Sequence, residues 1–370
     1  MFNADRLRLA RDVRGLKQSE LAQRLGVKPS AVSQFEHGRS RPSESTLKAL
    51  ALALEFPIDF FAPTEGHENP PSFFRSLRST SAGSRKQAEA TSDLLHVLTS
   101  TIEQYVVFPN AEIPMVPLSD RVTPGEAARE VRRRWGLPGG PVRNMVRLLE
   151  QHGVVVARTI RGSDDIDAFS RPFEPRPIVV LAADKKDRAR SRFDAAHELG
   201  HLVMHPHEEP ATKAVEDEAQ AFAAEFLMPE ADIQRELPVR LDWDRLVKLK
   251  FRWGTSIKSL LMRSRTLNVM PESAYVRAMK IYSSRGWNRG EPGDLGTPEI
   301  PRLLQRAVEL LEGSGIGILR LAEQSRLHIA EVERLLGEAG DVRPRVSLED
   351  SRSSAVTRLH APSGRARPQP

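Results

Sequence analysis

Residues 192–205 read RFDAAHELGHLVMH, and this stretch decides how the centre of the chain folds. Residues 187–205 contain no proline, and their apolar residues follow helical spacing, which predicts a helix. Residues four positions apart share one face of a helix, so His197 and His201 are placed to bind one metal ion. Glu198 lies beside them, where a base can take a proton from a metal-bound water. The sequence therefore predicts a helical metal site with its own base.

The third ligand of this site is not decided by the residues alone. A catalytic zinc needs three protein ligands and an open position, and the chain has no cysteine, so the ligand is His, Asp or Glu. His207 has the spacing of the H-E-x-x-H-x-x-G-x-x-H pattern, but Met204 stands where that pattern needs glycine. The acidic first turn of the next predicted helix offers Glu216, Asp217 and Glu218. Dipole compensation alone also explains this acidic run and selects none of the three.

The residues around this helix predict an α+β unit. Apolar, β-branched runs favour strands, and amphipathic segments favour helices. We expect two helices within 124–151, strands over 154–160 and 177–183, and helices over about 186–205 and 214–227.

A second pattern near the start of the chain predicts a helix-turn-helix. Residues 17–25 (KQSELAQRL) and 28–37 (KPSAVSQFEH) favour helices, separated by Gly26-Val27 and followed by Gly38. The second helix would enter the major groove of DNA. The candidate base contacts are Lys28, Ser30, Ser33 and Gln34, and the candidate phosphate contacts are Gln18, Arg14 and Arg41. A helical bundle used for protein contacts is the alternative, since residues 1–60 carry ten Lys/Arg and seven Asp/Glu.

Residues 5–61 resemble the XRE (Cro/C1-type) repressor family. The resemblance is carried by L-R-L-A-R, K-Q-S-E-L-A-Q-R-L-G-V, S-x-V-S-Q-F-E-H-G-R-S-R-P and L-x-A-L-A-x-A-L. It implies a five-helix domain that binds double-stranded operator DNA, usually as a homodimer.

Residues 119–236 resemble the ImmA/IrrE metallopeptidases. The matching stretches are D-A-F-S at 167–170, R-F-D-A-A-H-E-L-G-H-L-V-M-H at 192–205 and E-D-E-A-Q-A-F-A-A-E-F-L-M-P at 216–229. The family's third ligand is a Glu directly before the Ala of E-A-x-x-F-A, which corresponds to Glu218, with Glu216 and Asp217 as alternatives. The resemblance implies that His197, His201 and Glu218 bind Zn²⁺ and that Glu198 is the general base. Mn²⁺ also suits such a ligand set.

The sequence as a whole predicts a multidomain protein, mainly α with an α+β centre. We expect a helix-turn-helix domain (1–62), a linker with a helical segment (63–118), a zincin-like peptidase domain (119–236), a helical region (237–340) and a disordered tail (341–370). The helical pairs at 245–262 and 319–336 favour dimerisation or substrate docking over a second DNA contact, and no internal repeat is visible.

Composition and the two resemblances together predict the function. With 370 residues, a net charge of +6, no apolar run of membrane-spanning length and no signal peptide, we expect a cytoplasmic protein without a membrane partner. The prediction is a DNA-binding transcriptional regulator with a zinc-dependent endopeptidase that cuts a repressor- or antitoxin-like protein. The alternative is a DNA-binding repressor or antitoxin whose metal domain is a non-proteolytic sensor or toxin-binding module.

Overall fold

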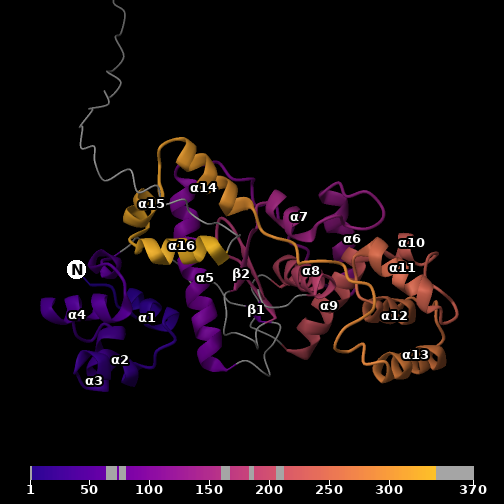
Figure 1. The fold of residues 1–370 in the computed structure, drawn as a ribbon, viewed down its shortest axis with the longest axis horizontal. Coiled ribbons are helices and arrows are strands. Elements are labelled where there is room, and N and C mark those ends of the chain that lie inside the picture. Colours follow the sequence, from indigo (N-terminus) through magenta and orange to yellow (C-terminus); the bar gives the residue numbers. More distant parts are fainter. Residues whose placement is uncertain are drawn as a thin grey trace, which may run out of the picture.

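The computed structural model describes residues 2–63, 73–74, 81–159, 167–182, 187–205 and 212–338. Helices dominate this part of the chain, as Figure 1 shows. The predicted disordered tail, 341–370, lies outside the described residues. The N-terminal elements are α1 (Ala4–Val13), α2 (Gln18–Leu25), α3 (Pro29–Glu36), α4 (Glu44–Leu54), the 3₁₀ helix η1 (Ile58–Phe61) and the long helix α5 (Ala82–Glu103).

The helices that follow in the chain fall into two groups. The central group is α6 (Pro124–Arg134), α7 (Met145–Gln151), α8 (Arg188–Met204), α9 (Lys213–Leu227), α10 (Glu230–Ile233), α11 (Trp243–Trp253), α12 (Ile257–Thr266) and α13 (Glu272–Ser284). The last group is α14 (Leu303–Gly313), α15 (Ile318–Ser325) and α16 (Ile329–Glu338). In Figure 1 the last group returns to the N-terminal half of the molecule and lies beside α5.

A four-stranded sheet lies at the centre of the molecule. Its strands are β1 (Phe73–Phe74), β2 (Val155–Thr159), β3 (Ala168–Arg171) and β4 (Ile178–Ala182), in the order β1-β3-β4-β2. Strand β2 is parallel to β4, and β3 is antiparallel to both β4 and β1. The β-branched runs correctly predict β2 and β4. The sequence analysis misses β1 and β3 because both are short and lack a run of β-branched residues.

The sheet separates two hydrophobic cores. Alternate residues of a strand face opposite sides, so Val155 and Ala157 enter one core while Val154 and Val156 enter the other. The first core joins the N-terminal helices, α5 and α14–α16. The second joins α6–α9 with α11–α13, where Trp253 is fully buried. The sheet thus stands between the helix-turn-helix side of the molecule and the helix that carries His197.

The predicted fold class, mainly helical with an α+β centre, is confirmed by this architecture. The limits proposed for the separate domains stay predictions. Within the described ranges, no helix is long and apolar enough to cross a membrane.

Candidate functional site

The two histidines of the H-E-x-x-H motif lie on one buried face of α8, as their spacing predicts. The Nε2 atoms of His197 and His201 are 3.0 Å apart. Both side chains are almost completely inaccessible to solvent. Two nitrogens bound tetrahedrally to one zinc lie roughly 3.3 Å apart, given Zn–N distances of about 2.0–2.1 Å. The spacing of the two imidazoles therefore suits a single ion.

Glu216 of α9 completes this cluster. Its Oε2 lies 3.2 Å from His197 Nε2, and its Oε1 lies 3.5 Å from His201 Nε2. One ligand atom from each of the three residues lies within 4.8 Å of the others. Burial by itself raises the pKa of Glu216, but the contacts with His197 and His201 outweigh it and lower the pKa to about 2. Glu216 is therefore an anion at neutral pH.

Glu218, the third ligand that the resemblance implies, does not belong to this cluster in the structure. Its Oε2 lies 3.0 Å from His205 Nε2 instead. The reason is the phase of α9: successive residues turn by about 100°, so two residues apart point in nearly opposite directions. Asp217 pairs with Lys213 at 3.4 Å and is mostly exposed, while His207 lies outside the described residues.

His205 and Glu218 support the cluster from behind. His205 is the C-cap of α8, and its Nδ1 lies 3.3 Å from His201 Nδ1. The other ring nitrogen of His205 contacts Glu218. A metal-binding imidazole is commonly oriented through the ring nitrogen that does not face the metal. Glu218 and His205 therefore fix the position of the His201 ring.

Close packing of α8 on α9 brings the carboxylate to the histidines. A Cβ atom on Gly200 would lie 3.1 Å from the Phe222 ring, which is tighter than an ordinary contact. Glycine at this position lets the two helices approach each other. This close approach places Glu216 opposite His197 and His201. It explains why glycine, which has no side chain, stands before His201 in H-E-L-G-H.

Glu198 is fully buried and receives a hydrogen bond from β3. The hydroxyl of Ser170 donates to Glu198 Oε2 at 2.8 Å. Ser170 itself is fully buried. This bond fixes the carboxylate beside the cluster. The sequence analysis quotes Ser170 within D-A-F-S but assigns it no role; that short motif is the signal that identifies it.

Buried ion pairs hold the two site helices in place. Arg192 of α8 pairs with Glu299, whose second oxygen accepts hydrogen bonds from the backbone N–H groups of Met145 and Val146 at the start of α7. On α9, Glu225 pairs with Arg263 of α12. These contacts fix α8 and α9 to the surrounding helices.

The chemistry of the cluster fits a divalent metal ion. Glu216 Oε1 is buried and makes no hydrogen bond to any described residue, although it faces His201. Two neutral imidazoles and one carboxylate are the donor set that zinc takes in hydrolytic sites. His197, His201 and Glu216 are thus the residues that could hold a metal.

The predicted DNA-contacting residues of the helix-turn-helix are mostly exposed, unlike the buried residues of the metal cluster. Helices α2 and α3 are joined through Gly26, which has a φ of 66°, and Pro29 occupies the first turn of α3. Lys28, Ser30, Gln34 and Arg41 are exposed on this side, and Ser33 is half-buried. Four of the predicted DNA contacts are therefore open to a ligand.

Two predicted phosphate contacts point elsewhere. Arg14 donates to the carbonyl of Leu54 and pairs with Glu331 at 2.9 Å, so its guanidinium lies between the N-terminal helices and α16. The phosphate role expected for Arg14 stays a prediction, and its guanidinium is held by partners within the chain. Gln18 donates to Glu36 Oε2 at 2.7 Å within the domain.

Comparison with known proteins finds a family model for each of these two regions. Residues 7–61 match a helix-turn-helix family model, and residues 149–265 match the model of the IrrE N-terminal-like domain. The chain carries a helix-turn-helix domain and an IrrE N-terminal-like domain. The second is a metallopeptidase-type domain, and the His-His-Glu cluster lies within it.

A curated relative supports the regulatory half of this description. An uncharacterized transcriptional regulator in the ATPase CF(0) region of Rhodospirillum rubrum is 43% identical over 56 residues. The match covers 15% of this chain and 52% of the relative, so the chain spans about half the length of that protein.

Proposed function

We propose that this chain is a DNA-binding transcriptional regulator whose IrrE N-terminal-like domain is a zinc-dependent endopeptidase. The observation that carries the proposal is the buried His197, His201 and Glu216 cluster with Glu198 beside it. A domain that only stored metal would have no use for a base at this position. The proposed substrate is a repressor- or antitoxin-like protein, as the resemblance to ImmA/IrrE implies.

In the proposed hydrolysis of a peptide bond, each residue of the site has a separate role. When bound, zinc would polarise the peptide carbonyl and lower the pKa of a water molecule toward neutrality. Glu198 accepts the proton of the attacking water and delivers it to the leaving nitrogen. Ser170 is a positioning residue, because its hydroxyl donates to Oε2 of Glu198 and so fixes the orientation of the carboxylate.

The proposed ligand set is His197, His201 and Glu216, and the second ligand is held by His205 and Glu218. Manganese also fits two imidazoles and a carboxylate. The proposed DNA contacts are the exposed residues Lys28, Ser30, Gln34 and Arg41, together with the half-buried Ser33 of α3. A homodimer on operator DNA stays a prediction.

A proteome-derived peptide library tests the hydrolytic role. The full-length chain is loaded with zinc, and new peptide termini are identified by mass spectrometry for the wild type and Glu198→Gln. We expect cleavage by the wild type, a loss of about 10²- to 10⁴-fold in Glu198→Gln, and unchanged metal content in both. Equal cleavage by Glu198→Gln would contradict the assigned base.

One observation favours the alternative function. Glu198 and both histidines are almost inaccessible to solvent, which suits a metal-sensing domain that cuts nothing. The same experiment separates the two proposals. Metal binding without cleavage by the wild type, combined with metal-dependent DNA affinity, would establish the sensor.

A further inference from the structure

Residues 303–338 repeat the backbone plan of the first three helices. Helix α2 covers Gln18–Leu25 and α15 covers Ile318–Ser325, and the helices that follow begin at Pro29 and Ile329. The residue directly after the first helix of each pair is left-handed: Gly26 has a φ of 66° and Arg326 a φ of 57°. Matching positions thus differ by 300 in residue number.

Hydrogen bonds and burial follow the same plan in both units. The backbone N–H of Val27 donates to the carbonyl of Ala22, and that of Leu327 donates to the carbonyl of Ala322, each at 3.0 Å. The matched buried pairs are Leu21 and Leu321, Ala22 and Ala322, and Val32 and Val332. Residues 303–338 are therefore a second helix-turn-helix unit, which contains the helical pair that the sequence predicts at 319–336.

The second unit is poorly suited to DNA. The recognition helix of the first unit, α3, has a single acid, Glu36, which is buried and paired with Arg11. The equivalent helix α16 carries Glu331 and Glu333 near its start, where base edges would be read. Acidic residues there repel phosphates. The exposed apolar side chain of Ile329 stands at the first turn of the same helix.

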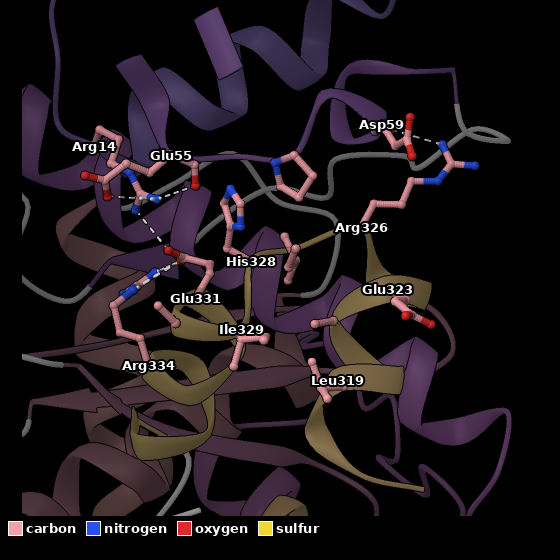
Figure 2. Close-up of a pocket in the computed structure, with 14 residues that line it drawn as sticks. Arg14, Glu55, Asp59, Leu319, Glu323, Arg326, His328, Ile329, Glu331 and Arg334 are labelled. Atoms are coloured by element: carbon pink, nitrogen blue, oxygen red, sulfur yellow. Dashed lines mark hydrogen bonds and ion pairs between the residues drawn. The ribbon is translucent and has the colours of Figure 1, made fainter. Parts of the chain in front are cut away.

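The face of α16 instead meets the DNA-binding domain. Glu331 is only 4% exposed and lies between Arg14 and Arg334 (Figure 2). Burial opposes its charged form, but Arg334 and Arg14 lower the pKa of Glu331, so it stays ionised at neutral pH. Arg14 belongs to the end of α1, so this ion pair joins the two units directly.

Arg326 makes the second link between the units. It occupies a left-handed position that favours glycine, and the first unit has Gly26 there. Its guanidinium extends toward the carbonyl oxygens of Asp59 and Pro63, at 3.5 and 3.4 Å. A cavity of about 810 Å³ separates the two units around these residues. Around this cavity, the Arg14–Glu331 pair and the contacts of Arg326 are polar links between the two units.

Helix α5 connects both units to the sheet. It packs against α1 and also against α15 and α16, which lie above α1 in Figure 1. Its Gln87 donates to the carbonyl of Val13 at 2.9 Å. Asp93 of the same helix pairs with Arg171 of β3, the residue after Ser170. The orientation of the DNA-binding domain therefore depends on α5 and on the junction with α16.

We propose that the second helix-turn-helix unit binds protein rather than DNA and that its partner is the DNA-binding domain of the same chain. Through the Arg14–Glu331 pair and Arg326, it holds that domain at one orientation relative to the metal cluster. The proposal stands whether or not the cluster hydrolyses peptides.

Distances between two spin labels test this holding role. The chain has no cysteine, so Leu52→Cys on α4 and Ser273→Cys on α13 introduce labels at two exposed positions. We expect a narrow distance distribution in this labelled parent, because the junction fixes the two bodies. In Glu331→Gln the distribution widens at least about twofold, since domains without a firm interface move relative to one another. Glu333→Gln, on the same helix but outside the cavity lining, leaves the width unchanged.

A second variant distinguishes loss of the contact from unfolding of α16 as the cause of a wider distance distribution. Arg326→Gly places at this position the residue that the first unit uses, so the turn remains compatible with the fold. It also removes the link to Asp59 and Pro63, and we expect a wider distribution together with unchanged helicity by circular dichroism. A parent distribution as broad as those of the variants, or variants as narrow as the parent, would overturn the proposal.

Salt dependence tests the claim that this unit avoids DNA. With a mixed-sequence duplex, Arg41→Gln lowers the slope of log affinity against log salt by about 0.9, the loss expected for one phosphate contact. We expect Arg320→Gln, at an exposed position of α15, to leave the slope unchanged. An equal drop in Arg320→Gln would show that the second unit contacts DNA and would overturn its assignment as a protein-binding unit.

Discussion

The metal cluster and the DNA-facing helix of this chain are built in opposite ways. His197, His201 and Glu198 are buried, and each lies against a side chain from another element or the next helical turn. Lys28, the N-cap of α3, and Gln34 within that helix are exposed. The stability of a buried polar cluster depends on the placement of each side chain, because a buried charge without a partner is costly. Exposed DNA-contacting side chains are solvated, so they contribute mainly when DNA is bound. The expected effects of mutation therefore differ in size between the two regions.

The largest loss of stability is expected from the buried pair behind α9. Arg263→Met removes the buried cation beside Glu225, which keeps an ion pair with the half-exposed Arg129, and lowers the free energy of unfolding by about 3 kcal/mol. The matched control, Arg265→Met, breaks an exposed pair with Glu272 and costs less than about 1 kcal/mol. Urea denaturation of the full chain measures both. Equal small losses would show that the buried pair is not what fixes α9.

The pH dependence of metal affinity tests whether both histidines are ligands. A proton and a metal ion compete for the same imidazole nitrogen, so we expect the metal affinity to fall on acidification. Glu216 contributes little to this fall, because its pKa is about 2 and it stays ionised. We therefore expect weaker metal binding at about pH 5.5 than at about pH 7.5, and proton competition at two ligands makes this fall steeper than it would be with one. Competition with a zinc-binding dye measures it, and a flat profile over this range would contradict ligation by both histidines.

Removing the hydroxyl of Ser170 probes how precisely Glu198 must be held. Ser170→Ala lowers hydrolysis about tenfold, since a hydrogen bond to a charged group contributes about 1.5 kcal/mol. The bound-metal content stays the same, because Ser170 makes its contact with the base and not with the three ligands. A variant that loses both metal and activity would assign Ser170 to the structure of the cluster instead.

The smallest effect is expected on the DNA-facing side. Lys28→Gln weakens binding to a mixed-sequence duplex by well under tenfold at moderate salt, since one exposed cation contributes one phosphate contact at most. Lys17→Gln, just before α2, is the control at the opposite end of the motif. Fluorescence anisotropy measures both, and a loss confined to Lys17→Gln would move the DNA contact away from α3.

The same contrast explains what could be predicted from the sequence. Helical spacing places His197 and His201 on one face, and the turn at Gly26 marks the helix-turn-helix, because both depend on residues close in the chain. Which carboxylate of α9 meets the histidines depends on how α9 is rotated against α8, and no local pattern contains that rotation. The role of Arg14 depends in the same way on Glu331, which is far away in the sequence.

The sequence predicts the helical pair at 319–336 but shows only a loose likeness to the first helix-turn-helix, for a related reason. The backbone of this pair follows the first, but an arginine replaces the glycine of the turn, and leucines replace the aromatic and acidic residues at the end of the helix. Burial requires only apolar residues of suitable size at these positions. The same backbone can therefore form although the residues that identify the motif in the sequence are replaced.

Bound-metal content tests the central claim, that His197, His201 and Glu216 form the metal site. Elemental mass spectrometry is applied to the purified wild type, Glu216→Ala and Glu218→Ala after incubation with zinc and removal of the excess. We predict about one zinc per chain in the wild type, loss of it in Glu216→Ala, and retention with about 10- to 100-fold weaker affinity in Glu218→Ala. Loss in Glu218→Ala with retention in Glu216→Ala, or a wild type that takes up no metal, would contradict the account.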